Sequence, residues 1–205
     1  GQAVRVTLAN PSETDSKGAS RILSIASAPR DANLTLITRM RDSSFKRGLA
    51  ALDAGAELTV SGPIGHFALH EDTSRPAVFL AGGIGITPFL SMIRNEAHKG
   101  FERKITLVYA NSRPDDAACL GELQHLADIH PNFELVATMT APKGSHWKGE
   151  IGRIDGSMLQ RHVQDPNEPI YYCVGPANMV ASTQDILSRL GITPQDVRVE
   201  QFAGY

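Results

Sequence analysis

The chain holds only two cysteines, Cys119 and Cys173, among its 205 residues. Two cysteines cannot build a disulfide framework, and they are too few for a cysteine-based zinc site. A reducing compartment, the cytoplasm, is the simplest setting for such a chain. An excess of positive charge is missing too, because 20 Lys and Arg residues face 22 Asp and Glu residues, a formal net charge of −2. This balance argues against a nucleic-acid partner.

Long apolar runs are also lacking. No stretch approaches the roughly 18 apolar residues that a membrane-spanning helix needs, and no signal-peptide pattern opens the sequence. The G-x-S-x-G turn is missing, so a hydrolase triad of that type has no scaffold. The G-x-G-x-x-G dinucleotide fingerprint is missing as well. What remains is an ordinary globular composition with 41% hydrophobic residues, enough for a real core.

The pattern of the chain changes near the polar run from Glu71 to Pro76. This change predicts two domains, 1–72 and 73–205. The first half shows short apolar alternations separated by turn residues, which are typical of an antiparallel sheet or barrel with one short helix. The expected strands are Ala3–Ala9, Arg21–Ala26, Leu34–Met40 and Glu57–Ser61, and the helix is Ser44–Leu52.

The second half alternates strand-like and helix-like segments, which predicts an α/β domain with a parallel five-stranded sheet. The carboxyl ends of such strands bind ligands, so the loops 82–88, 110–115 and 175–179 are expected at one edge. The expected strands are Val78–Ala81, Ile105–Tyr109, Phe133–Met139, Ile170–Val174 and Val197–Glu200, and the helices are Pro88–Lys99, Ala118–Ile129, Ser157–Val163 and Asn178–Leu190.

A glycine-rich turn directly follows the first of these parallel strands. Gly82, Gly83 and Gly85 permit positive φ angles or the close approach of a ligand. A strand, a glycine turn and a helix N-terminus together present backbone N–H groups to a phosphate. Thr87 is expected to cap the helix, and Pro88 suits its first turn. A tight turn without any ligand is the alternative interpretation.

Six short motifs in order resemble the ferredoxin–NADP reductase superfamily, which pairs an antiparallel flavin-binding barrel with an α/β nicotinamide-nucleotide domain. The stretch from Thr38 to Arg47 resembles the compact bacterial FAD-binding oxidoreductases without an iron–sulfur domain. The motifs are Gly1-Gln2 (P-G-Q), Arg21-Ile22-Leu23-Ser24 (R-x-[YF]-S), Gly62 to Phe67 (G-P-x-G-x-F), Gly82 to Pro88 (G-G-x-G-x-[TA]-P), Gly175 to Met179 (G-P-x-x-M) and Glu200-Gln201-Phe202 (E-x-F).

The resemblance implies an FAD site in the first domain. The Arg21 guanidinium would hold the flavin diphosphate, and the Ser24 hydroxyl would lie near flavin N5. In isolation, Arg21 and Ser24 could equally be an exposed strand pair. Glu200 and Phe202 would complete the catalytic group, with Phe202 over the flavin face or simply in the core. Further implied FAD-binding residues are Ile22, Leu23, Thr38, Arg39, Ser44, Phe45 and Lys46.

The resemblance also implies a nicotinamide-nucleotide site in the second domain. Gly82, Gly83, Gly85 and Thr87 would surround its pyrophosphate. Ser112 and Arg113 follow the second parallel strand, and this pair of a donor and a cation suits the 2′-phosphate of NADPH. NADH stays possible, because carboxylates follow directly in the sequence. The other implied contacts are Pro88, Gly175, Pro176, Met179 and Phe202.

Three features depart from the family pattern. Leu23 stands where the family places Tyr or Phe, so π-stacking on the flavin ring is lost. Val174 stands where a cysteine is frequent, and the alternation along the strand turns Cys173 away from the site. Members also carry one or two barrel strands before the P-G-Q turn, so the resemblance predicts a barrel that is incomplete at its N-terminal side.

Taken together, the resemblance implies an FAD-dependent oxidoreductase that takes hydride from NAD(P)H and passes electrons to an acceptor that the sequence does not identify. A ferredoxin, a flavodoxin, a haem domain or a small-molecule oxidant would suit such chemistry. The alternative is a nucleotide-binding electron-transfer or regulatory subunit without turnover of its own.

Overall fold

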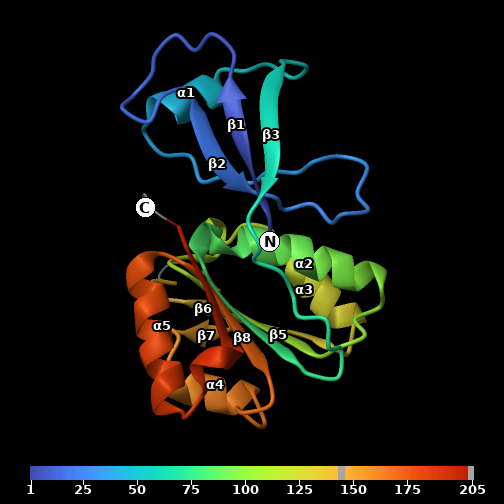
Figure 1. Ribbon diagram of the computed structural model, residues 1–205. Coiled ribbons are helices and arrows are strands. Elements are labelled where there is room, and N and C mark those ends of the chain that lie inside the picture. Colours follow the sequence, from blue (N-terminus) through green and yellow to red (C-terminus); the bar gives the residue numbers. More distant parts are fainter. Residues whose placement is uncertain (143–145, 203–205) are drawn as a thin grey trace.

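A computed structural model describes residues 1–142 and 146–202. The chain forms two lobes that meet along the N-terminal end of helix α2 (Figure 1). The elements of the smaller lobe are β1 (Ala3–Leu8), β2 (Ser20–Ser24), α1 (Ser44–Ala50) and β3 (Leu58–Ile64). Those of the larger lobe are β4 (Ala77–Gly82), α2 (Ile86–His98), β5 (Ile105–Asn111), α3 (Leu120–Ile129), β6 (Phe133–Met139), β7 (Glu150–Ile151), α4 (Gly156–His162), β8 (Ile170–Gly175), α5 (Ala177–Arg189) and β9 (Val197–Gln201).

The small lobe is an antiparallel sheet of order β2-β1-β3, a partial barrel. Helix α1 places Phe45 in a small core with Val4, Val6 and Leu8. All seven residues of β3 are exposed. The predicted strand Leu34–Met40 was wrong, because in the described residues this segment makes a single bridge, between Ile25 and Leu36.

The large lobe is a parallel sheet of order β7-β6-β5-β4-β8-β9. The five predicted strands are present, and the two-residue strand β7 adds a sixth that the sequence did not predict. Helices α2 and α3 cover one face and helices α4 and α5 cover the other (Figure 1). The central strands β4, β5 and β8 are almost continuous apolar runs, as strands buried on both faces require.

Side-chain alternation along β8 separates two neighbouring residues as the sequence predicted. Cys173 packs with the α4 and α5 side, whereas Val174 packs with the α2 side. Burial raises the pKa of the Cys173 thiol to about 12, so this cysteine stays a neutral core residue. In the described residues no helix has the length and apolar character that crossing a membrane would demand.

A buried pair connects the segment between the lobes to the sheet. Tyr172, fully buried in β8, accepts a hydrogen bond at its hydroxyl from the His70 backbone N–H at 2.9 Å. The same hydroxyl lies 2.8 Å from His70 Nδ1, and His70 Nε2 lies 3.0 Å from the Arg75 carbonyl oxygen. Because that carbonyl only accepts, Nε2 carries the proton and Nδ1 accepts from the tyrosine. Burial lowers the pKa of His70, in agreement with a neutral ring.

Tyr172→Phe is expected to lower the free energy of unfolding by about 1–3 kcal/mol, because the buried backbone N–H and Nδ1 of His70 lose their hydrogen-bond partner. Tyr171→Phe is the matched control, since the Tyr171 hydroxyl donates a single 2.9 Å bond to the Pro166 carbonyl. This control should lose only about 0.5–1.5 kcal/mol. Urea denaturation of both variants measures the difference. Equal losses would contradict the role assigned to the His70 pair.

Candidate functional site

A cavity of about 650 Å³ lies where the two lobes meet. Strand β2, the segment 37–43 and α1 form one side of it, and the start of α2 with the end of β9 forms the other. Ten of the predicted site residues line this cavity. They are Arg21, Ile22, Leu23, Ser24, Thr38, Arg39, Lys46, Thr87, Glu200 and Phe202.

The small-lobe side of the cavity is rich in cations. Arg21 and Lys46 both lie over the Phe45 ring, with Arg21 Cζ 5.1 Å and Lys46 Nζ 5.9 Å from its centroid. Lys46 Nζ also donates to the Thr38 hydroxyl. Burial, together with the nearby Arg21 charge, lowers the pKa of Lys46. An arginine and a lysine held side by side attract an anion, which fits a phosphate-binding site.

The opposite side carries the C-terminal residues of the E-x-F motif. Glu200 Oε2 is buried and has no hydrogen-bond partner among the described residues. Burial raises the pKa of Glu200. Phe202 is half-buried and packs against the core beside α2. Glu200 and Phe202 therefore share one cavity with Ser24, although the sequence separates them by more than 170 positions.

The glycine turn forms a close crossing with the end of β8. Gly83 has a φ of +54°, and a Cβ on Gly175 would lie 3.0 Å from the Met179 sulfur and 3.2 Å from Gly82 Cα. Pro176 packs here too, 3.2 Å from the position of a Cβ on Gly82. The glycines thus let β4 and β8 end side by side at the carboxyl edge of the sheet.

The predicted helix cap at Thr87 was wrong. A short 3₁₀ turn, Gly83–Gly85, precedes α2, so the helix begins at Ile86 with Gly85 as its N-cap. Thr87 is inside the first turn together with Pro88, and its hydroxyl donates to the Ile84 carbonyl at 3.0 Å. Because Ile84 and Thr87 line the cavity, the N-terminal end of α2 faces it.

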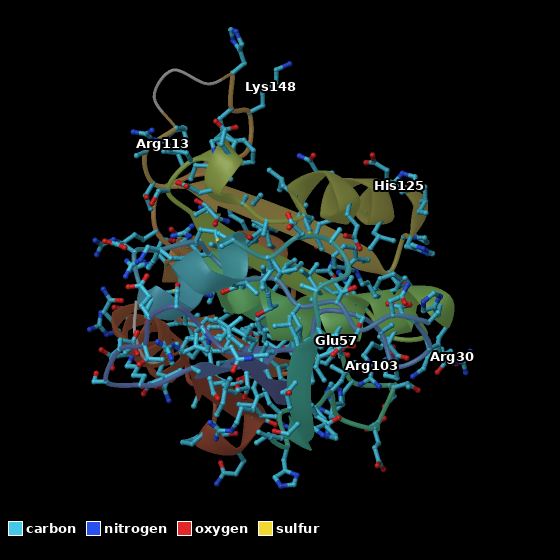
Figure 2. The ribbon with its side chains drawn as sticks, turned by 90° about the horizontal axis from the view of Figure 1, so that it is seen from above. Arg30, Glu57, Arg103, Arg113, His125 and Lys148 are labelled. Atoms are coloured by element: carbon cyan, nitrogen blue, oxygen red, sulfur yellow. The ribbon has the colours of Figure 1, made fainter. Side chains whose placement is uncertain are left out.

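Ser44 and Phe45 have buried side chains that are not among the cavity-lining residues, and Phe45 belongs to the small-lobe core. Their helix α1 is capped by Ser43, which accepts from the Lys46 backbone N–H at 3.3 Å. Ser112 and Arg113 are exposed beyond the carboxyl end of β5, followed by the 3₁₀ turn Pro114–Asp116. Figure 2 shows Arg113 at the same end of the molecule as Lys148.

Sequence reasoning missed several residues that line the cavity. Arg41, Asp42 and Ser43 lie within a stretch that already showed family resemblance, so a closer examination of that stretch could have found them. Asp15, Ser16 and Lys17 lie in the loop between β1 and β2, which carries no motif. The remaining additions are Ala3, Ile37, Ile84 and Gln201.

Comparisons with known proteins give a family and several relatives for this chain. Residues 79–185 match the family model described as oxidoreductase NAD-binding domain. The chain is 27% identical over 188 residues to the terephthalate 1,2-dioxygenase reductase component 2 of Comamonas sp, with 91% of this chain and 56% of the relative covered. It is 29% identical over 187 residues to the toluate 1,2-dioxygenase electron transfer component of Pseudomonas putida, covering 89% and 54%.

A further relative is the NADH-cytochrome b5 reductase 1 of Neosartorya fischeri, 28% identical over 165 residues, with coverages of 77% and 53%. The chain therefore spans about half the length of these curated relatives. Among solved structures, the cytochrome b5 reductase domain of Ulva prolifera nitrate reductase has a TM-score of 0.82 at 22% identity, covering 98% of this chain and 84% of that one. This likeness confirms the two-lobed fold that the motifs predicted.

Proposed function

The chain belongs to the oxidoreductase NAD-binding domain family, and on that premise we propose that it is an FAD-dependent oxidoreductase that oxidises NAD(P)H. The observation that carries the proposal is the cavity between the lobes. It joins the R-x-x-S strand, the cationic segment 38–46 and the terminal Glu200 and Phe202 in one space. Its volume of about 650 Å³ suits the reactive part of a cofactor.

The residues present fit a flavin. Arg21, Arg39 and Lys46 would hold its diphosphate. The buried Glu200 oxygen, which has no partner within the described part of the chain, indicates a polar group still to be satisfied. Leu23 would contact the ring through apolar surface, and Ser24 would present a hydroxyl at the reacting edge. When bound, a flavin accepts a hydride from a reduced nicotinamide and releases electrons to an acceptor.

The nicotinamide nucleotide would lie along the carboxyl edge of the parallel sheet. The backbone of Gly83 and Gly85 and the N-terminal end of α2 would receive its pyrophosphate, and the packing of Gly82 against Gly175 and Met179 supports that turn. Ser112 and Arg113 are exposed at the end of β5, where the adenosine ribose is expected. A donor and a cation favour the 2′-phosphate of NADPH, and this preference is part of the proposal.

The acceptor is proposed from chemistry and from the names of relatives. Two relatives are named as a reductase or electron transfer component of a dioxygenase, which makes an oxygenase component a candidate acceptor. A ferredoxin, a flavodoxin, a haem domain or a small oxidant would serve equally. A subunit that binds nucleotide without its own turnover is the second candidate, favoured by Leu23 at the flavin ring and by the fully exposed β3.

Flavin absorbance decides between the two candidates. The purified chain, reconstituted with FAD, should show a flavin spectrum that NADPH or NADH bleaches under anaerobic conditions. Candidate acceptors added to the reduced protein should then restore the spectrum. A chain that binds nucleotide but neither retains FAD nor bleaches would support the subunit without turnover.

Arg113→Ala tests the nucleotide preference. If Arg113 binds the 2′-phosphate, its loss should raise KM for NADPH by about tenfold or more, the size of a charge-assisted contact, and leave KM for NADH unchanged. Arg30→Ala is a matched control, because Arg30 is an exposed loop arginine on the far side of the molecule (Figure 2). Steady-state kinetics with both nucleotides measure the effect. Equal losses for NADPH and NADH, or a wild-type preference for NADH, would overturn the assignment.

A further inference from the structure

The loop between β1 and β2 closes over the Arg21 guanidinium. Arg21 Nη2 lies 2.5 Å from Asp15 Oδ2. Arg21 Nη1 donates to the carbonyl oxygens of Gly18 at 2.9 Å and Ser20 at 2.8 Å. The Phe45 ring covers a flat face of the guanidinium. The arginine that the flavin diphosphate would use is therefore already engaged on its Nη atoms by its own loop.

Asp15 is held in the charged form in this position. Its Oδ1 accepts the Lys17 backbone N–H at 2.9 Å. That bond, assisted by Arg21, lowers the pKa of Asp15, so it is a carboxylate at neutral pH. Two residues earlier, Glu13 forms a two-bond ion pair with Arg47 of α1 at 2.5 and 2.8 Å. Ion pairs therefore connect the β1–β2 loop to both β2 and α1.

Asp15 differs from the other carboxylates of the cavity in its ion pairing. Five cationic side chains line it: Lys17, Arg21, Arg39, Arg41 and Lys46. Three carboxylates line it as well, those of Asp15, Asp42 and Glu200. Asp42 pairs with Arg47, and Glu200 lies on the opposite side. Within residues 1–142 and 146–202, Asp15 is the cavity carboxylate that forms an ion pair with one of the five cations.

We infer that Asp15 is an internal counter-ion that competes with the flavin diphosphate for Arg21 and so sets flavin affinity. The inference rests on the proposed flavin site. Asp15 takes one of the two Nη2 N–H groups of Arg21 and balances its charge, so it weakens the attraction of the guanidinium for a diphosphate. FAD binding is therefore strongest when Asp15 turns away, and the Asp15–Arg21 pair holds FAD affinity below what the cavity cations alone would give.

Asp15→Asn removes the charge and keeps an oxygen that can still accept the Lys17 N–H. We expect this variant to bind FAD about three- to tenfold more tightly than the wild type, the scale of a partly exposed ion pair. Flavin fluorescence quenching measures the dissociation constant. Inorganic pyrophosphate should also compete with FAD more strongly in the variant. Asp15→Ser, whose hydroxyl can accept the same N–H, is a second variant should the first fail to fold.

Glu13→Gln is the matched control, because it removes the same charge from the same loop but from an ion pair with Arg47. It should leave FAD affinity within about twofold, since Glu13 pairs with Arg47, is not among the cavity-lining residues, and has an exposed charge that salt screens. The Arg21→Ala background supplies the second control. There, Asp15→Asn should no longer tighten binding, because a double-mutant cycle isolates the coupling between the two side chains.

The outcomes separate the inference from the proposed function. Tighter binding in Asp15→Asn alone, lost in the Arg21→Ala background, supports competition. Unchanged or weaker FAD binding in a folded Asp15→Asn variant overturns it, and weaker binding would make Asp15 a residue that orients Arg21. Equal tightening in Glu13→Gln also overturns it, because general charge would then explain the effect. Failure of the wild type and all variants to bind FAD would instead refute the proposed flavin site.

Discussion

Gly85→Ala is expected to lower the free energy of unfolding by about 1–3 kcal/mol, the usual cost of forcing an extra carbon into a packed site. A Cβ on Gly85 would lie 2.7 Å from the Val174 carbonyl carbon and 2.9 Å from Gly175 Cα, and it would also contact the Val174 oxygen. These neighbours are backbone atoms of β8, which cannot rotate away. The 3₁₀ turn would therefore shift from the sheet, and nucleotide affinity should fall with stability.

Gly121→Ala is the control for this change. Gly121 lies inside α3, and a Cβ there would meet nothing within 4 Å. Alanine should stabilise that helix by about 0.5–1 kcal/mol. Urea denaturation and NADPH titration of both variants give the comparison. A Gly85→Ala protein with wild-type stability and nucleotide affinity would show that the close approach to β8 is not required.

The parallel lobe could be predicted almost completely from the sequence. Its central strands, such as Ala77–Gly82, are apolar on both faces, and the helices between the strands carry an apolar stripe, so the two patterns are easy to separate. The exception is β7, whose two residues pair with Thr138 and Met139 at the sheet edge. A two-residue strand is too short to show a periodic sequence pattern, so it can be identified only from its hydrogen bonds to the neighbouring strand.

The strands of the small lobe were harder to predict, because a segment forms a strand only when it hydrogen-bonds to a neighbouring segment. The segment from Leu34 to Met40 is rich in leucine, isoleucine and threonine like a strand, yet Leu36 alone has a bridge partner among the described residues. The sequence pattern of a segment does not show whether another strand lies close enough to pair with it.

The wrong prediction of a helix cap at Thr87 has a similar cause. Capping preference identifies residues that suit a helix start, but the 3₁₀ turn before α2 moved that start to Gly85 and Ile86.

The sequence predicted those residues of the candidate site that belong to a motif, and it did not predict the others. Arg21 and Ser24 belong to a motif that resembles those of flavin-binding proteins, and Glu200 and Phe202 belong to another such motif, so we expected them to line one cavity. Asp15 belongs to no motif. Its importance arises only from the path of the β1–β2 loop, which returns its carboxylate to within 2.5 Å of Arg21. Loop paths depend on tertiary contacts such as the Glu13–Arg47 pair, which a local pattern does not encode.

Replacing Ser24 should have a large effect on the rate of flavin reduction and a small effect on FAD affinity. It is the last residue of β2, pairs with Ala3 in the sheet, and is 9% exposed at the cavity wall. Ser24 lines the same cavity that Glu200 and Phe202 line from the other lobe, where hydride arrival is proposed. A donor fixed at such a point stabilises charge as it develops, because the sheet holds it without reorganisation.

Ser24→Ala is therefore expected to slow flavin reduction by NADPH about a hundredfold, the effect of removing one preorganised donor. FAD affinity should change by less than about threefold, since one neutral hydrogen bond contributes little to binding. Stopped-flow absorbance gives the rate, and fluorescence quenching gives the affinity. Ser27→Ala is the matched control, because the buried Ser27 hydroxyl accepts the Thr35 N–H at 3.1 Å and lies outside this cavity. It should cost stability without slowing reduction, whereas a wild-type reduction rate in Ser24→Ala would remove Ser24 from the chemistry.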